Sequence, residues 1–183
     1  VDDALDTVTD TAGTDHVMSS VSYTIGTGIE NLTLTGAGNV NATGSTAANI
    51  ITGTTGDNWL RGLNGNDTLD GGDGNDTLDG GSGLDILTGG LGADVFDFNA
   101  VPALGGADTI TDFVSGPGND VLDISDLLTG YTGNITDYVQ ITQNGGDTIV
   151  SVDSNGLSGG VSFQLLATLT GVNLGTDEAA LVL

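Results

Sequence analysis

The chain has 183 residues, a length typical of one domain or of one elongated repeat array. Its 25 acidic residues stand against a single basic one, Arg61, and the net charge of −24 excludes nucleic-acid and anionic-membrane binders, which depend on Lys and Arg. No cysteine is present, so disulfide frameworks and thiolate metal sites are excluded, and metal ligands must be oxygens. Disordered chains are also acidic and glycine-rich, but a mean hydropathy of +0.12 argues against disorder, and the Val, Ile, Leu, Ala and Thr content favours strands.

The N-terminal stretch does not resemble a cleaved signal peptide. Its first ten residues, VDDALDTVTD, lack the basic and then apolar layout of a cleaved signal peptide, and no apolar run approaches the length of a membrane span. The absence of an initiator Met suggests a fragment of a longer protein. Farther along, TGIENLTLTG has the features of a degenerate, or worn, repeat. We therefore expect residues 1–43 to form degenerate solenoid or capping strands.

Between residues 44 and 97 the sequence divides into nine-residue units. They are GSTAANIIT (44–52), GTTGDNWLR (53–61), GLNGNDTLD (62–70), GGDGNDTLD (71–79), GGSGLDILT (80–88) and GGLGADVFD (89–97). Positions one to five carry Gly, Asn and small residues that suit tight turns, and position eight is always apolar. Each unit predicts a turn and a short strand with one inward side chain, so that two units make one coil of a flattened right-handed parallel β-solenoid. The inward residues are Ile51, Leu60, Leu69, Leu78, Leu87 and Phe96.

This predicted core is thin, so another interaction must contribute to the stability of the fold. At roughly 25 cal/mol per Å² of apolar area, a single column of Leu and Ile opposes an ordering cost of about 1 to 2 kcal/mol per residue. Stacking the coils also places the turn of unit n beside that of unit n+2, so the sixth-position carboxylates converge. Without a cation that arrangement is strongly unfavourable.

After residue 97 the nine-residue register breaks. SGPGNDVLD (115–123) is a last partial repeat, and Ser125 is placed to begin one short helical turn. DYVQITQ and DTIVSVD, on either side of residues 144–146, predict a β-hairpin, and VSFQLLATLTGVNL predicts a further strand. We expect residues 98–183 to form a β-rich cap on the open end of the solenoid, because repeat arrays need such caps for solubility.

The units match the pattern GGxGxDxUx, and over residues 44–97 the chain resembles the RTX calcium-binding β-roll proteins. GGDGNDTLD and GGSGLDILT fit every defining position. The resemblance implies that several Ca²⁺ ions lie between the turns of units n and n+2. Positions two, four and six of the first turn and positions one, three and six of the later turn would supply carbonyl and carboxylate oxygens, the ligands that calcium prefers.

The resemblance assigns the ligands residue by residue. One site comprises Leu63, Gly65, Asp67, Gly80, Ser82 and Asp85. A second comprises Gly72, Gly74, Asp76, Gly89, Leu91 and Asp94. A third, with one charge fewer, comprises Thr54, Gly56, Asn58, Gly71, Asp73 and Asp76, and a pairing of Asn49 with Asp67 loses a charge in the same way. Asp85, Asp94, Asp108, Asp112 and Asp120 either complete further sites at the cap junction or form solvated surface.

The C-terminal part carries a second resemblance. The stretches ADVFDF, ADTITDF, GNDVLDISDLL and GGDTIVSVD resemble the end region of proteins exported by type I secretion, particularly large bacterial surface adhesins, and the final TDEAALVL resembles part of an export signal. This implies a secreted, extracellular protein, or one attached to the cell surface through its parent protein. The implied partners are calcium, the type I secretion machinery and a cell-surface or glycan target of the parent, without nucleic-acid binding or membrane insertion.

The first functional hypothesis is therefore a calcium-binding module that folds on extracellular calcium and supports the secretion of a larger exoprotein such as an adhesin. We expect no enzyme activity, because the chain has no nucleophile, base or zinc motif and its lone His16 has no matching partner. Trp59 is interpreted as a packing or surface residue. Two alternatives stay open: the non-catalytic tail of an RTX protease, lipase or alginate-modifying enzyme, and a surface or glycan interaction domain.

Overall fold

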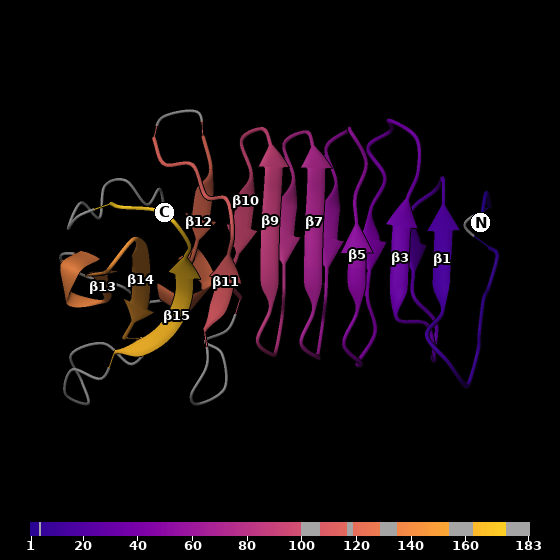
Figure 1. The fold of residues 1–183 in the computed structure, drawn as a ribbon, viewed down its shortest axis with the longest axis horizontal. Coiled ribbons are helices and arrows are strands. Elements are labelled where there is room, and N and C mark those ends of the chain that lie inside the picture. Colours follow the sequence, from indigo (N-terminus) through magenta and orange to yellow (C-terminus); the bar gives the residue numbers. More distant parts are fainter. Residues whose placement is uncertain (4, 100–106, 117–118, 129–134, 154–162, 175–183) are drawn as a thin grey trace.

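The computed structural model describes the chain except for residues 4, 100–106, 117–118, 129–134, 154–162 and 175–183. Its described residues form an all-β parallel solenoid, as predicted, with strands alternating between two facing sheets along one axis (Figure 1). The first sheet begins with the parallel strands β1 (His16–Ser19), β3 (Asn31–Leu34), β5 (Ile50–Thr52), β7 (Thr68–Asp73), β9 (Ile86–Leu91) and β11 (Asp108–Ile110). The second consists of β2 (Tyr23–Thr24), β4 (Ala42–Thr43), β6 (Trp59–Arg61), β8 (Thr77–Asp79), β10 (Val95–Asp97) and β12 (Val121–Asp123).

The strand register confirms that two nine-residue units make one coil. Leu69 of β7 pairs with Leu87 of β9, and Leu60 of β6 pairs with Leu78 of β8, so equivalent positions of units n and n+2 lie side by side. The glycine-rich halves of the units form the turns at the two edges between the sheets, which places the sixth position of every unit directly before a strand.

The eighth-position side chains form the predicted core column. Leu60, Leu69 and Leu78 are fully buried, whereas Ile50, one residue before the buried Ile51, remains 54% exposed. This follows from the alternation of side chains along a strand, because only one face of each sheet points to the interior.

Parallel coils continue beyond the regular repeats in both directions. Upstream, Val17 of β1 pairs with Leu32 of β3, and Leu32 pairs with Ile51 of β5. Downstream, Leu87 pairs with Ile110 of β11, and Phe96 of β10 pairs with Leu122 of β12. The worn repeat at residues 27–36 therefore contributes a solenoid strand, and the extra residues after 97 lie between strands without ending the two ladders.

The C-terminal strands extend the first sheet. The predicted hairpin is confirmed as β13 (Val139–Asn144) and β14 (Asp147–Val152), which pair antiparallel, and β15 (Gln164–Leu169) joins β14 to β11. The short helical turn at Ser125 is also confirmed, as the 3-10 helix η1 (Ser125–Leu128); a second, η2, spans Ile135–Asp137. The sequence TDEAALVL lies outside the described residues. In the described part, no helix is long and apolar enough to cross a membrane.

The core column yields a test of the fold. Leu78→Ala removes a fully buried side chain and should lower the free energy of unfolding by about 2 to 5 kcal/mol, since the stacked coils cannot close the cavity. Ile50→Ala, on the exposed face, should change it by less than about 0.5 kcal/mol. Urea unfolding in the presence of calcium measures both values, and equal losses would contradict the assigned inward face.

Candidate metal centre

The sixth-position side chains form two buried columns, one at each edge of the solenoid. The first contains Asn49, Asp67, Asp85 and Asp108, and the second contains Asn58, Asp76, Asp94 and Asp120. Every one of these residues is at most 4% exposed. The turns thus bury carboxylates in a row, which proteins do only when the charges are paired, protonated or bound to a metal.

One oxygen of each carboxylate accepts a hydrogen bond from a backbone N–H of the protein. The backbone N–H of Asn49 donates to Asp67 Oδ1 at 2.7 Å, and that of Asp67 donates to Asp85 Oδ1 at 2.7 Å. In the other column the N–H of Asp76 donates to Asp94 Oδ1 at 2.8 Å. This repeated bond joins successive coils and fixes the orientation of each carboxylate.

The second oxygen of four of these carboxylates has no partner in the described structure, whereas Asp120 Oδ2 accepts from Val114 N–H at 2.8 Å. Oδ2 of Asp67, Asp76, Asp85 and Asp94 is buried without a hydrogen bond, although a carboxylate oxygen is a strong acceptor. A buried acceptor without a donor is costly and requires an explanation. A divalent cation bound by these oxygens supplies one, so the residues present fit the metal that the sequence predicts.

The pKa values of the column carboxyls reflect the same problem. Burial raises the pKa of Asp67 to about 7, even though the N–H of Asn49 opposes the shift, and the charge of Asp85 adds to it. Burial likewise raises the pKa of Asp76 and of Asp94 to about 6 and that of Asp108 to about 7. Without a cation, Asp67 and Asp108 therefore keep their protons up to about pH 7, and Asp76 and Asp94 up to about pH 6.

Backbone carbonyls of the next turn approach the free oxygens. A Cβ built on Gly62 would overlap both Asp67 Oδ2 and the carbonyl oxygen of Gly80, so these two oxygens face the same glycine. Gly80 in turn lies against Asp85 Oδ2. Gly71 has the same relation to Asp76 Oδ2 and to the carbonyl of Gly89. The structure thus brings together positions six and one of the two sites predicted between residues 63 and 94.

Positions two, three and four of these sites also pack closely. The carbonyls of Leu63 and Gly65 press against the next turn, where a side chain at Gly81 or Gly83 would overlap them. Ser82 N–H donates to the Leu63 carbonyl at 2.7 Å, and the Ser82 carbonyl accepts from Gly65 N–H at 2.9 Å. A carbonyl oxygen has a second lone pair, so these bonds are compatible with a cation ligand at the same oxygen.

The turns with Asn at position six differ from those with Asp. Thr54 N–H donates to Asn58 Oδ1 at 2.6 Å, and Asn58 Nδ2 donates to the Val40 carbonyl at 2.7 Å, so this side chain is satisfied by the protein. Asn49 is held in the same way by Ser45 N–H, at 2.7 Å, and by two upstream carbonyls. The third predicted site, which includes Gly56, Asn58, Gly71, Asp73 and Asp76, therefore has one unsatisfied carboxylate oxygen, on Asp76, where each of the other two sites has two.

The backbone of position two accounts for this difference. In the Asp turns this position has a positive φ, and at Leu63 it does so with a side chain, at 81°. Such a conformation is unfavourable for leucine and favours glycine, the residue found at position two of the next three turns. Thr54 and Ser45 have no positive φ, and their N–H groups reach the Asn oxygens.

The downstream aspartates continue the columns although the spacing changes. Asp85 N–H donates to Asp108 Oδ1 at 2.9 Å across 23 residues, and Asp94 N–H donates to Asp120 Oδ1 at 3.0 Å across 26 residues. Both Asp108 and Asp120 are buried, so neither lies on solvated surface. Asp112 accepts from the N–H groups of Gly89 and Gly90 at 2.9 and 2.8 Å.

Sequence reasoning missed an upstream extension of the first column. Asp15 and Glu30 occupy the position before β1 and β3, and Asp15 N–H donates to Glu30 Oε2 at 2.9 Å, as in the regular coils. Asp15 Oδ2 is buried without a hydrogen bond. The pattern was hard to see because Glu replaces Asp and the two residues are 15 apart. The one signal in the sequence was an acidic residue directly before a strand with alternating apolar and polar residues.

The described residues contain no cluster of three or more acidic, histidine or cysteine side chains suited to a metal. Each of the two complete predicted sites joins two carboxylates, so backbone carbonyls must supply most of the oxygens. Calcium accepts six to eight oxygen ligands of this kind in a flexible geometry, whereas magnesium requires a tighter octahedron and retains its waters.

Comparison with known proteins identifies the repeats. The family model described as RTX calcium-binding nonapeptide repeat (4 copies) matches residues 43–78 and 70–100. Residues 43–100 are RTX calcium-binding repeats. This segment is a non-catalytic calcium-binding module, and its turns are those that bury the unpartnered carboxylate oxygens.

Two solved structures match a large part of the chain. It is similar to the AlgE6R3 subunit of the Azotobacter vinelandii mannuronan C5-epimerase, with 29% identity and a TM-score of 0.53 over 75% of this chain and 79% of that one. It also matches the extracellular lipase LipA from Serratia marcescens, with 17% identity and a TM-score of 0.33 over 88% of this chain and 45% of the lipase. No curated protein matches the sequence.

The raised pKa values predict how stability depends on pH without metal. The unfolded chain releases these carboxyl protons near pH 3.8, whereas folded Asp67 holds its proton to about pH 7 and Asp76 to about pH 6. The folded state therefore binds more protons between these values, and its stability is highest below pH 3.8 and falls as the pH rises to 7. In a chelator, the folded fraction measured by circular dichroism should decrease in the order pH 4.5, 6 and 7.5; a constant or rising series would contradict the buried columns.

Asp67→Asn distinguishes the destabilising effect of the buried charge without metal from its stabilising effect as a calcium ligand. Without metal the variant should be more stable than the parent at pH 7.5, because the buried charge is gone. With calcium it should be less stable, with calcium affinity reduced by about tenfold or more, since even changes outside the ligand shell cost about 10- to 100-fold. Circular dichroism in chelator gives the first sign as a larger folded fraction, and urea unfolding in calcium gives the second.

Asp70→Asn is the matched control, because Asp70 belongs to the same unit but is exposed. This variant should change neither the folded fraction in chelator nor the urea midpoint in calcium appreciably. Loss of stability in chelator for Asp67→Asn, or an equal calcium effect in the two variants, would contradict the assignment.

Proposed function

We propose that this chain is a calcium-responsive folding module of a larger exported protein. The observation that supports this most is the set of four buried, unpartnered carboxylate oxygens within the RTX segment. Without a cation their burial opposes folding, and with a cation the same oxygens become ligands that tie unit n to unit n+2 in the next coil. The switch is therefore between an unstable metal-free state and a stable calcium-bound state.

The ligands that we propose are those of the two complete sites. Asp67 and Asp85 with the carbonyls of Leu63, Gly65, Gly80 and Ser82 would hold one ion; Asp76 and Asp94 with the carbonyls of Gly72, Gly74, Gly89 and Leu91 would hold another. The coils with Asn49 and Asn58 would need less calcium, since their side chains are already hydrogen bonded. The module would divide into an N-terminal part to residue 43, the RTX roll to 97 and a cap to 183.

The charge of −24 and the calcium dependence suit export. Extracellular calcium modules bind at about 10⁻⁴ to 10⁻³ M, so the chain would stay unfolded in a calcium-poor cytoplasm and fold outside. Passage through a type I exporter requires such an unfolded chain, and the acidic repeats would then act as the external folding signal. The same charged columns would thus support secretion through a type I exporter.

The parent protein has two candidate classes. The resemblance of the C-terminal stretches favours a large surface adhesin, in which this chain would form the exported end. The similarity to a subunit of the mannuronan C5-epimerase favours the non-catalytic repeat region of a polysaccharide-modifying enzyme. In both cases the chain itself would supply calcium-dependent structure, and any catalysis would belong to another domain.

Calcium-dependent folding is testable on the chain as it stands. Circular dichroism should show a disordered spectrum in chelator at pH 7.5 and a cooperative change to a β spectrum as calcium reaches about 10⁻⁴ to 10⁻³ M, with magnesium ineffective at the same concentrations. Asp76→Ala should shift the midpoint to higher calcium, and Asp70→Ala should leave it unchanged. A β spectrum that survives chelation, or an equal response to magnesium, would refute the proposal.

A further inference from the structure

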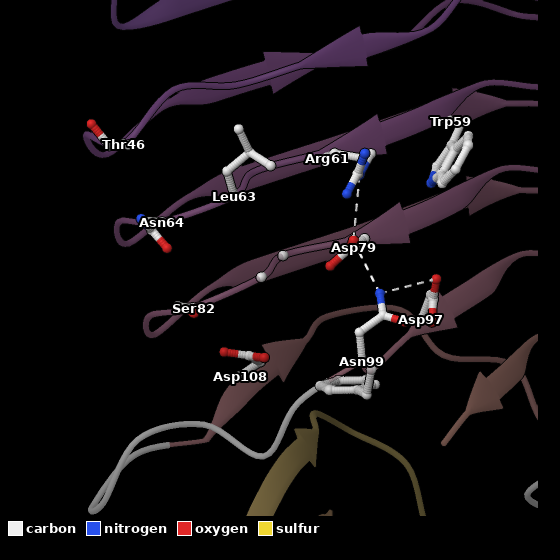
Figure 2. A pocket seen from close by; sticks show the side chains of 13 residues that line it. Thr46, Trp59, Arg61, Leu63, Asn64, Asp79, Ser82, Asp97, Asn99 and Asp108 are labelled. Atoms are coloured by element: carbon white, nitrogen blue, oxygen red, sulfur yellow. Dashed lines mark hydrogen bonds and ion pairs between the residues drawn. The ribbon is translucent and has the colours of Figure 1, made fainter. Parts of the chain in front are cut away.

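A groove of about 620 Å³ lies on the outer face of the second sheet, across β6, β8 and β10. Figure 2 shows Trp59 and Arg61 on one strand, Asp79 on the next, and Asn99 reaching toward Asp79 from the chain after β10. Small-molecule sites usually enclose about 300 to 1,000 Å³, so the groove has the size of a binding site. None of these four side chains belongs to the calcium columns.

Trp59 is placed for contact with a ligand and contributes little to the core. It is 46% exposed, while its neighbour Leu60 is fully buried in the column. Arg61, two residues on and therefore on the same face, lies with its guanidinium carbon 5.3 Å from the centroid of the Trp59 ring. An exposed aromatic side chain beside a concave surface is typical of binding sites, because it buries a large rigid area at low entropic cost.

The polar groups of the groove leave no net positive charge for an anionic ligand. Arg61 Nε lies 3.6 Å from Asp79 Oδ2, and Asp79 is only 8% exposed. Asn99 Nδ2 donates to Asp79 Oδ2 at 3.2 Å and to Asp97 Oδ2 at 3.4 Å. Three carboxyl groups, those of Asp79, Asp97 and Asp108, therefore line the groove with the single guanidinium, in a chain of charge −24, and a polyanion would be repelled.

A cationic ligand is disfavoured as well. The attraction of an aromatic ring for cations is already used by Arg61, whose charge would repel a second cation at that position. What the groove offers is one flat apolar ring, the apolar wall of Leu63, and several hydrogen-bond acceptors and donors on the opposite side. An uncharged ligand with apolar faces and many hydroxyl groups matches this arrangement.

We propose that the groove binds a neutral oligosaccharide, with a sugar ring packed on Trp59 and its hydroxyls hydrogen bonded to Asp79, Asp97 and Asn99. The groove shares Leu63, Gly80 and Ser82 with the first proposed calcium site. Binding should therefore require calcium, and this coupling rests on the function proposed above. Leu63 keeps its side chain in the groove despite its positive φ of 81°.

The single tryptophan of the chain makes the groove directly observable. The full chain, folded in saturating calcium, is titrated with cello-, xylo-, malto-, laminari- and chitohexaose while Trp59 fluorescence is recorded. At least one of these should give a saturable shift in emission, and a hexauronate and spermine should give none. Calorimetry with the binding hexasaccharide should show a loss of affinity of about tenfold or more for Trp59→Ala.

Ile50→Ala, on the outer face of the opposite sheet, is the control and should bind like the parent. Circular dichroism of each protein separates the two proposals. A chain that folds with calcium but binds no neutral hexasaccharide, or binds only the hexauronate or spermine, overturns the groove assignment and leaves the calcium module intact. Binding that persists in chelator overturns the coupling, and a chain that does not respond to calcium overturns the coupling together with the proposed function.

Discussion

The rest of the structure depends on two rows of carboxylates held at the spacing of stacked strands. Parallel strands lie about 4.8 Å apart, and each coil contributes one buried side chain to each row. The hydrogen bond from one coil to Oδ1 of the next fixes this geometry, while Oδ2 stays buried and unpartnered. The same contact that aligns the coils thus concentrates negative charge, so the apolar column can be stable only when the charge is removed by protons or balanced by a cation.

The coils do not share this dependence equally. At Asn49 and Asn58 a neutral amide takes its hydrogen bonds from the backbone of its own turn and from the preceding coil. From Leu63 onward the second residue of the turn adopts a positive φ, the backbone no longer reaches the side chain, and an oxygen is left free. The sixth residue and the turn conformation therefore change together. The coils with Asn49 and Asn58 are satisfied without a cation, whereas the coils after them depend on one.

The regular part of this architecture was predictable because its period is physical. Nine residues with Gly-rich turns and an apolar eighth position determine which side chains point inward, and the spacing of 18 residues then places Asp67 beside Asp85. The upstream coils were harder to recognise because Glu30 replaces Asp and the turn length changes. The burial of Asp108 and Asp120 could not be predicted, since the inserted residues conceal which aspartate returns to the column.

The contrast between the Asn turns and the Asp turns also could not be predicted from the sequence. Asn58 and Asp76 occupy equivalent positions, and a pattern that counts ligands treats the first as a weaker version of the second. Only the backbone angles and the hydrogen bonds of Thr54 show that the Asn turn is closed by the protein itself. In the same way, the pattern gave no sign that Trp59, Arg61 and Asp79 line one groove, because their proximity comes from the pairing of β6 with β8.

The most direct test is a crystal structure of the chain grown with calcium, with anomalous diffraction data to locate the ions. We expect anomalous peaks within about 2.3 to 2.6 Å of Oδ2 of Asp67, Asp76, Asp85 and Asp94 and of the facing carbonyls, including those of Gly80 and Gly89. An ordered solenoid in which these four oxygens accept hydrogen bonds from protein or water, with no cation beside them, would contradict the account.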